Sequence, residues 1–175
     1  MKFPSSPSSG GDQTFFKIKP GETQTVVVRG EPYEFFARWE GNKSIHVREG
    51  DHGAKFKFRI NLIVSEVVSG NKVMSAKVWE QGPTVYNILK EMHAEYDLVK
   101  TALKIKREGS GMDTEYTILP VRQELTPAQI KSVDAVQLQD LAADHRKEQK
   151  ANAHNEPPFG DDEPPPFDPT DEIPF

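Results

Sequence analysis

The sequence predicts a mainly β fold, a small five-stranded barrel with one helix inserted before its last pair of strands. Three observations lead to this prediction. Short runs rich in Val, Ile, Phe and Thr are separated by Gly, Pro and Asn, one stretch over residues 83–96 has helical spacing, and a last pair of runs flanks a loop with two glycines. The 175 residues can build one core of ordinary size with extended ends, but not two full cores.

Composition narrows the class of protein. The chain has no cysteine, which excludes disulfides, thiolate metal sites and thiol nucleophiles and is typical of a reducing intracellular compartment. No apolar run approaches the roughly 20 residues that a membrane-spanning helix needs, and the start of the chain lacks the hydrophobic stretch of a signal peptide. We therefore expect a soluble, cytoplasmic protein with no membrane partner.

Charge is distributed unevenly along the chain. The net charge is -5, but residues 151–175 hold seven acidic residues and no Lys or Arg, so residues 1–150 hold 20 acidic against 22 basic residues. Between Arg38 and Arg107 the balance is 13 basic against 8 acidic residues. A basic body with an acidic end is typical of a nucleic-acid-binding domain whose tail is repelled by the ligand and can compete for its site.

The first part of the chain reads as an arm followed by strands. Residues 1–14 are rich in Ser, Pro and Gly and are predicted to form a flexible N-terminal arm. The β-type runs that follow cover residues 23–29, 33–39, 43–48, 55–68 and 72–79.

The fourth run, residues 55–68, has the clearest alternation. Its apolar set, predicted to face the core, is Phe56, Phe58, Ile60, Leu62 and Val64. The residues between them, predicted to form a polar row on the other face, are Lys55, Lys57, Arg59 and Asn61. The sequence Ser69-Gly70-Asn71-Lys72 then predicts a tight hairpin, because Gly and Asn tolerate positive φ.

Helical spacing replaces the alternation after residue 81. Pro83 suits a first helical turn, and an apolar stripe follows it at Val85, Ile88, Leu89, Met92 and Tyr96. Two further runs, residues 103–107 and 114–119, flank the glycine loop 108–113. Several strands, one helix and a final hairpin are the element order of an OB barrel, so we assign residues 15–122 to an OB-fold domain, although other small barrels share this order.

The C-terminal part divides into a helix and a tail. Thr126-Pro127-Ala128-Gln129 forms a capping box with proline at the first helical position, and residues 123–150 are predicted to be a C-terminal helix. Residues 151–175 hold seven of the 14 prolines together with seven acidic residues. Too little apolar surface is available there to offset the entropy of ordering, so this segment is predicted to be a disordered acidic tail.

Cations and aromatic rings, the requirements for binding a single strand, occur together in this domain. Cations meet phosphates, and aromatic faces stack on bases at roughly 1–3 kcal/mol per base. Lys77 and Trp79 alternate with core-type residues and are predicted to form a base platform, unless the following helix covers Trp79. The pattern leaves open whether Trp39 is exposed or packs in the core, and whether Tyr116 stacks on bases or lies in the core or rim.

The basic residues are predicted to line the same groove. Rows of cations are often only the solvated side of a sheet, but the middle strands and loops of an OB barrel converge on one groove. We expect five residues to meet in a common trough: Lys55, Lys57, Arg59, Lys77 and Trp79. The full set of predicted single-stranded-DNA-binding residues is Phe36, Arg38, Trp39, Lys43, Arg48, Lys55, Lys57, Arg59, Lys77, Trp79, Lys104, Lys106, Arg107 and Tyr116.

Catalytic and cofactor sites are poorly supported. The chain has no glycine-rich phosphate loop after a strand, and Gly109-Ser110-Gly111 fits a hairpin loop better than a nucleophile elbow. His46 and His52 could share a metal, but no third ligand is evident. We therefore expect a binding protein without catalytic residues, cofactor or metal.

The tail carries an internal repeat. Acid, proline and phenylalanine recur in Glu156-Pro157-Pro158-Phe159, Glu163-Pro164-Pro165-Pro166-Phe167 and Glu172-Ile173-Pro174-Phe175, with the phenylalanines eight residues apart. A tail that only confers solubility does not need such phenylalanines. We expect them to enter hydrophobic pockets of partner proteins while the acids meet a basic rim. The predicted docking residues at the end of the tail are Asp171, Glu172, Ile173, Pro174 and Phe175.

Two parts of the chain resemble known families. The end Asp-Glu-Ile-Pro-Phe resembles the acidic tip of bacterial single-stranded-DNA-binding proteins, and the body over roughly residues 33–120 resembles the phage single-stranded-DNA-binding (helix-destabilising) proteins. The matching stretches of the body run from Phe36 to Ser44 (FARWEGNKS), from Lys77 to Gly82 (KVWEQG) and from Lys104 to Pro120 (KIKREGSGMDTEYTILP).

The resemblance implies an OB fold and a role in DNA replication, recombination and repair. It implies that the barrel binds single-stranded DNA and that the tail recruits partners such as a polymerase, helicase or recombinase, in the host bacterial cytoplasm if the chain is phage-encoded. Many phage relatives hold zinc through Cys and His after the equivalent of Trp39; residues 46–53 here contain no cysteine, so zinc is not carried over. An OB-fold adaptor for protein or RNA is the alternative, and weak self-association is left open.

Overall fold

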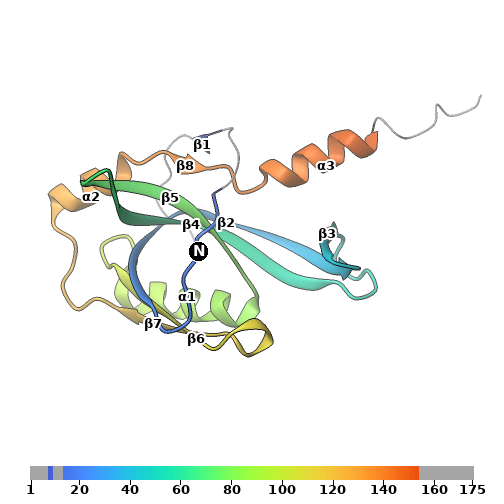
Figure 1. The fold of residues 1–175 in the computed structure, drawn as a ribbon, viewed down its shortest axis with the longest axis horizontal. Helices are drawn as coiled ribbons and strands as arrows, with labels where there is room; N and C mark the ends of the chain where they lie inside the picture. Colours follow the sequence, from blue (N-terminus) through green and yellow to red (C-terminus); the bar gives the residue numbers. More distant parts are fainter. Residues whose placement is uncertain (1–7, 10–13, 154–175) are drawn as a thin grey trace, which may run out of the picture.

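The computed structural model describes residues 8–9 and 14–153 (Figure 1). The predicted tail beyond Ala153 and most of the predicted arm lie outside these residues. The described elements are β1 (Ser8–Ser9), β2 (Thr23–Glu40), β3 (Lys43–Val47), β4 (Lys55–Val68), β5 (Asn71–Gln81), α1 (Pro83–Tyr96), β6 (Leu103–Glu108), the short 3-10 helix η1 (Gly111–Asp113), β7 (Glu115–Pro120), α2 (Pro127–Asp134), β8 (Leu138–Gln139) and α3 (Ala143–Ala153).

The fold is mainly β, as predicted. A six-stranded antiparallel sheet has the order β5-β4-β2-β6-β7, and β3 pairs with the outer end of β2. Helix α1 connects β5 to β6, at the point in the chain where a helix was predicted. Within the described residues β5 and β7 share no backbone pairing, so the sheet is not closed. Side chains meet across this opening, where the rings of Trp79 and Tyr116 lie 5.4 Å apart, edge to face.

Strand β2 differs from its prediction. The two expected runs, 23–29 and 33–39, form one strand of 18 residues. The pairing with β4 shifts between Arg29 and Tyr33, which is a bulge that bends the strand. Gly30 in this bulge has a φ of 76°, and a Cβ there would lie 3.1 Å from the Leu138 side chain. The Gly and Pro that suggested a turn therefore mark a bend within one strand.

The β4–β5 hairpin confirms its prediction. Val68 pairs with Asn71, and the two connecting residues, Ser69 and Gly70, have φ values of 51° and 79°. Two consecutive residues with positive φ match the right-handed twist of the flanking strands.

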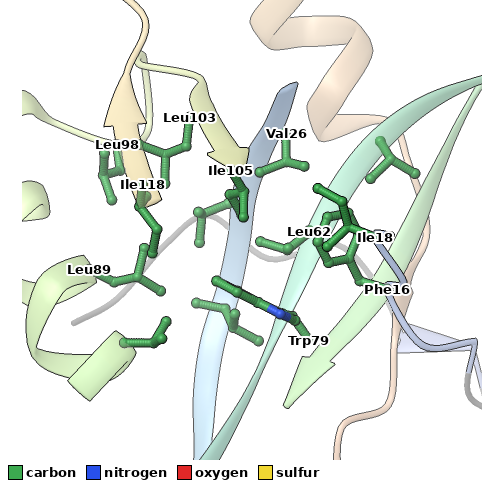
Figure 2. Packing of buried hydrophobic residues seen from close by; sticks show 14 of the residues in the cluster. Phe16, Ile18, Val26, Leu62, Trp79, Leu89, Leu98, Leu103, Ile105 and Ile118 are labelled. Atoms are coloured by element: carbon green, nitrogen blue, oxygen red, sulfur yellow. The ribbon is translucent and has the colours of Figure 1, made fainter. Parts of the chain in front are cut away.

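The main core lies on the inner face of the sheet, beneath α1 (Figure 2). It combines Phe58, Ile60, Leu62 and Val64 of β4 with residues of β2, β6, β7 and α1. Trp79 lies in the middle of this cluster and is 2% exposed. The prediction that Trp79 faces away from the core is therefore wrong. Phe16 and Tyr116 cover its ring, together with α1, because β4 and β5 pair Trp79 directly with the inward-facing Ile60.

A second apolar cluster lies on the outer face of the same sheet. Val27, Ile63 and Ala76 are covered there by Val133 of α2 and Leu138 of β8.

The predicted helix over residues 123–150 is wrong as one continuous element, because β8 separates α2 from α3. The capping box of Thr126 and Gln129 starts α2 as predicted, but α2 ends at Asp134. Residues 138–139 form β8 and residues 141–142 form a turn, because Leu138 and Leu141 are buried and Gln139 hydrogen-bonds to β4 and β5; this tertiary gain exceeds the helical propensity.

We predict that Gly109→Ala destabilises the fold through the β6–β7 loop. Gly109 has a φ of 72°, and a Cβ there would lie 2.0 Å from the Asp113 carbonyl oxygen. A strained backbone position of this kind costs about 1–3 kcal/mol in free energy of unfolding. Gly111→Ala is the matched control, since Gly111 also has positive φ but has no atom within 4 Å of an added Cβ. Urea denaturation should show the larger loss for Gly109→Ala; equal losses would contradict the clash.

Candidate nucleic-acid interface

Strands β2, β3 and the start of β4 form an arm that projects from the body of the sheet (Figure 1). Strand β5 pairs with β4 only as far as Phe58, so the outer end of the arm has three strands. Its outer face carries Phe35, Ala37 and Trp39 of β2, because alternate residues of a strand share a face. Lys57 pairs with Phe35 and Lys55 with Ala37, which places both lysines on this face too.

Trp39 is the exposed aromatic residue of this face. It is 65% exposed, and the Lys57 ammonium nitrogen lies 6.0 Å from the centroid of its ring. Lys55 is exposed beside it. A large ring in solvent with cations on the same face can stack on a base while the cations meet phosphates. The structure therefore resolves the alternative left open for Trp39, which does not pack in the core.

Glu80 partly neutralises the cations next to Trp39. Its two carboxylate oxygens accept hydrogen bonds from Lys57 Nζ (3.0 Å) and Arg59 Nε (2.8 Å). Lys57 and Glu80 are both partly buried. The pair orients Lys57 along the sheet, and Lys55 is left as the exposed cation of the predicted row.

Arg59 is not on the open surface where it was expected. It is 5% exposed, because residues 138–145 cover this part of the outer face. Its Nη1 donates to the Leu141 carbonyl oxygen (3.1 Å) and to the Asp144 carboxylate (2.6 Å). Its guanidinium carbon lies 5.0 Å from the Phe35 ring centroid and 5.6 Å from that of Phe15.

The Arg59 contacts change the ionisation of their partners. Partial burial opposes ionisation of Asp144, but its hydrogen bond to Arg59 and the charge of Arg59 outweigh this and lower the pKa of Asp144. Burial likewise opposes the charge on Arg59, and its bonds to Asp144 and Glu80 outweigh that and raise the pKa of Arg59. The ion pair is thus more stable than either separated charge at this position.

Two stacked histidines lie where α3 meets the arm. The rings of His46 and His145 are parallel with centroids 4.3 Å apart, and His145 also packs edge-on against Phe35. The Tyr33 hydroxyl and His145 Nδ1 are 3.1 Å apart. Burial, followed by the charge of Arg59, lowers the pKa of His145 to about 4. His145 is therefore neutral when α3 is docked at neutral pH.

The other predicted residues of the arm lie away from Trp39. Phe36 and Arg38 alternate with it and point to the opposite face, where Phe36 packs against Phe56 and Arg38 pairs with Glu40. Lys43 pairs with Glu40 in the β2–β3 ladder and shares that opposite face. Arg48 follows β3 in an exposed turn.

The remaining predicted residues are distributed over other parts of the domain. Lys77 forms an ion pair with Glu66 (3.4 Å) on the inner side of the sheet, and Trp79 and Tyr116 pack in or against the core. Lys104 and Lys106 pair with Thr25 and Thr23 at the other end of β2 from the arm. Arg107 donates to the Ile18 carbonyl oxygen and holds the N-terminal loop.

The expectation of one common trough is therefore wrong. Lys55, Lys57 and Arg59 share the outer face, but Trp79 lies in the core and Lys77 on the opposite face. The aromatic partner of the lysines is Trp39. The predicted binding set does not include Phe35, His46 or His145. Alternation places Phe35 on the face of Trp39, and His46 was considered only as a metal ligand, whereas His145 is brought in from a distant part of the chain.

Comparisons of the chain with protein-family models, with curated proteins and with solved structures find no match.

Two further properties of the described residues concern metal binding and membrane insertion. Over 8–9 and 14–153, three or more His, Cys, Asp or Glu side chains do not come together in a group that could hold a metal ion. In the same part of the chain, every helix is too short or too polar to cross a bilayer.

We predict that the docking of α3 weakens as the pH falls from neutrality toward about 4. Docked His145 stays neutral, whereas released His145 takes up a proton below its ordinary pKa of 6.5, so stability is fully present above pH 6.5 and declines below it. The charged and titratable groups that face His145 include Arg59, Asp144, His46, Glu80, Arg146 and Tyr33. Loss from protonation of Asp144 starts only below its ordinary pKa of 3.8, since its docked pKa is lower still.

Hydrogen exchange measures this effect. Corrected for the intrinsic rate, amides of residues 143–150 should exchange faster at about pH 5 than at about pH 7.5. His145→Gln serves as the control, because an amide side chain cannot take up the proton. Equal pH dependence in the variant and the wild type would assign the effect to another group.

Proposed function

We propose that the protein binds single-stranded DNA with little sequence preference, without catalysis, during DNA replication, recombination and repair. The observation that carries the proposal is the exposed Trp39 ring on one face with Lys57 and Lys55. The resemblance of residues 33–120 to phage single-stranded-DNA-binding proteins supports it. We place the protein in the cytoplasm, where such a ligand is exposed at replication forks.

We further propose that the domain is an OB barrel. The order of five strands, the pairing of the first with the fourth (β2 with β6), and a helix before the fourth support this assignment. Strand β3 and the long ends of β2 and β4 are then an enlarged connection between the first two barrel strands. Connections at this position line the nucleic-acid site of OB folds.

We predict that Trp39→Ala weakens binding to oligothymidine by roughly 5- to 150-fold, the equivalent of losing one stacked base. The two tryptophans allow a direct spectroscopic test, because Trp39 is 65% exposed and Trp79 is 2% exposed. DNA should quench the fluorescence of the wild type, and Trp39→Phe should leave only the unquenched Trp79 signal. An unchanged quench in Trp39→Phe, or no binding by the wild type, would overturn the proposal.

Salt dependence tests the lysines. Lys55→Gln should reduce the magnitude of the slope of log affinity against log salt by about 0.7, the contribution of one neutralised phosphate. Lys90→Gln removes the same charge from an exposed position on α1 and should leave the slope unchanged. Parallel titrations with RNA and duplex DNA establish whether the single strand is preferred.

We propose that the acidic tail recruits replication and recombination proteins, with Phe175 as its terminal hook. The support comes from the sequence, since the tail lies outside the described residues. Deleting residues 168–175 should abolish capture of a partner polymerase, helicase or recombinase while leaving affinity for oligothymidine equal or higher, because acids that compete with DNA are removed. Weaker DNA binding by the truncated chain would contradict this assignment.

A protein-binding adaptor is the second candidate. The tip of the β4–β5 hairpin exposes three aliphatic side chains, Val67 (76%), Val68 (53%) and Val73 (45%). Clustered exposed aliphatic residues are typical of protein contacts. This candidate is favoured if oligonucleotides fail to bind at low salt.

A further inference from the structure

The row of polar residues on β4 continues from the open arm to beneath the C-terminal segment. Lys55 and Lys57 are followed on the same face by Arg59 and Asn61, which are 5% and 2% exposed. Residues 138–145, the part of the chain between the start of β8 and the first turn of α3, cover these two. We call this stretch the cover segment. The surface of the proposed DNA site thus has an exposed half and a covered half.

Oxygen atoms of the cover segment accept hydrogen bonds from the two covered residues, Arg59 and Asn61. The Asn61 side chain donates to the backbone carbonyl oxygen of Gln139 (3.0 Å) and accepts from the backbone N–H of Gln139 (3.0 Å). Arg59 donates to the Leu141 carbonyl and to the Asp144 carboxylate. A carboxylate and carbonyl oxygens on an Arg side chain occupy the place that phosphate oxygens take in a nucleic-acid complex.

The covered half also contains aromatic rings. The guanidinium of Arg59 lies over the rings of Phe35 and Phe15, and His46 lies against Phe35. Phe15 is already 38% exposed. An arginine between ring faces, next to an amide side chain that both donates and accepts, has the chemistry to hold an unpaired nucleotide.

Three of the eight side chains of the cover segment are buried, and the other five are partly exposed. Its buried side chains are Leu138, Leu141 and His145, and α3 is exposed from Arg146 to Lys150. A pocket of about 340 Å³ lies between residues 138–142 and the bulge of β2 at residues 30–33. Segments with few buried contacts open at a lower free energy than the whole domain.

We propose that Arg59 and Asn61 form a second, covered part of the nucleic-acid site, and that a bound single strand displaces the cover segment and takes over its contacts to these residues. The inference rests on the proposed DNA binding at Trp39. It implies that Asp144 and the DNA backbone compete for Arg59. Short oligonucleotides would use the open arm alone, and longer ones would extend along β4.

The test compares two substitutions that remove one negative charge from the same helix. Asp144→Asn weakens the competitor for Arg59, whereas Glu148→Gln alters an exposed residue one helical turn further along α3. Asp144→Asn should bind long oligothymidine several-fold more tightly, with a salt slope steeper by about 0.7 because one more phosphate is contacted. Glu148→Gln should match the wild type.

Two further measurements test whether the cover segment is displaced by the DNA. His145→Gln loosens α3 without changing charge at neutral pH and should also tighten binding to long oligothymidine. In the wild type, saturating long oligothymidine should speed hydrogen exchange in residues 138–150, and a short oligonucleotide should not. Equal affinities of Asp144→Asn and Glu148→Gln, with unchanged exchange, would overturn the inference while leaving DNA binding at Trp39 intact. Absence of binding by the wild type and by every variant would instead remove the proposed function.

Discussion

The buried guanidinium of Arg59 connects the separate parts of the outer face. Arg59 belongs to β4, pairs with Glu80 of β5 and Asp144 of α3, and lies on Phe35 of β2 and on Phe15. A buried cation is costly to remove from water unless charged and hydrogen-bonding partners surround it. The positions of Glu80, Asp144 and the Leu141 carbonyl follow from this requirement. Removing one partner would leave the other charges uncompensated, so the group acts as a unit.

This requirement divides the outer face into two parts. Around Arg59, the C-terminal segment covers the sheet and supplies the needed oxygens. Farther along the arm, β5 has ended and β2 pairs with β3 and β4, and among the described residues no element covers Trp39. The proposed binding surface is therefore the part of the arm that extends beyond the covering C-terminal segment. Because Lys57 shares Glu80 with Arg59, the charges of the open and covered parts are also linked.

The two tryptophans show that the exposure of a ring depends on the elements that surround it. Each follows a basic residue by one or two positions and precedes a glutamate, in Arg38-Trp39-Glu40 and Lys77-Val78-Trp79-Glu80. Trp79 pairs with Ile60 and is enclosed by Phe16 and Tyr116, whereas Trp39 pairs with Ser44 at the end of the arm. Similar local sequences therefore place one ring in the core and the other in solvent. Alternation in one strand assigns residues to two faces, but it does not say which face another element covers.

The sequence alone determined those elements whose formation depends on residues close together in the chain. The alternation of residues 55–68, the Ser69-Gly70 turn, helix α1 and the capping box of Thr126 each predicted the element that is observed. It also separated a basic body from an acidic tail. These features depend on side chains within a few residues of one another, which is the range over which backbone propensity and periodicity act.

Only the tertiary structure decided which surface is open. Residues 138–142 leave the predicted helix because Asn61, Arg59 and Ala76, which are far away in sequence, form hydrogen bonds with them. The same contacts bury the cation expected at the surface, and the extension of the arm beyond the covering segment exposes Trp39, whose place the pattern left open. Contacts between distant residues have no period along the chain, so the choice between Trp39 and Trp79 required the assembled sheet.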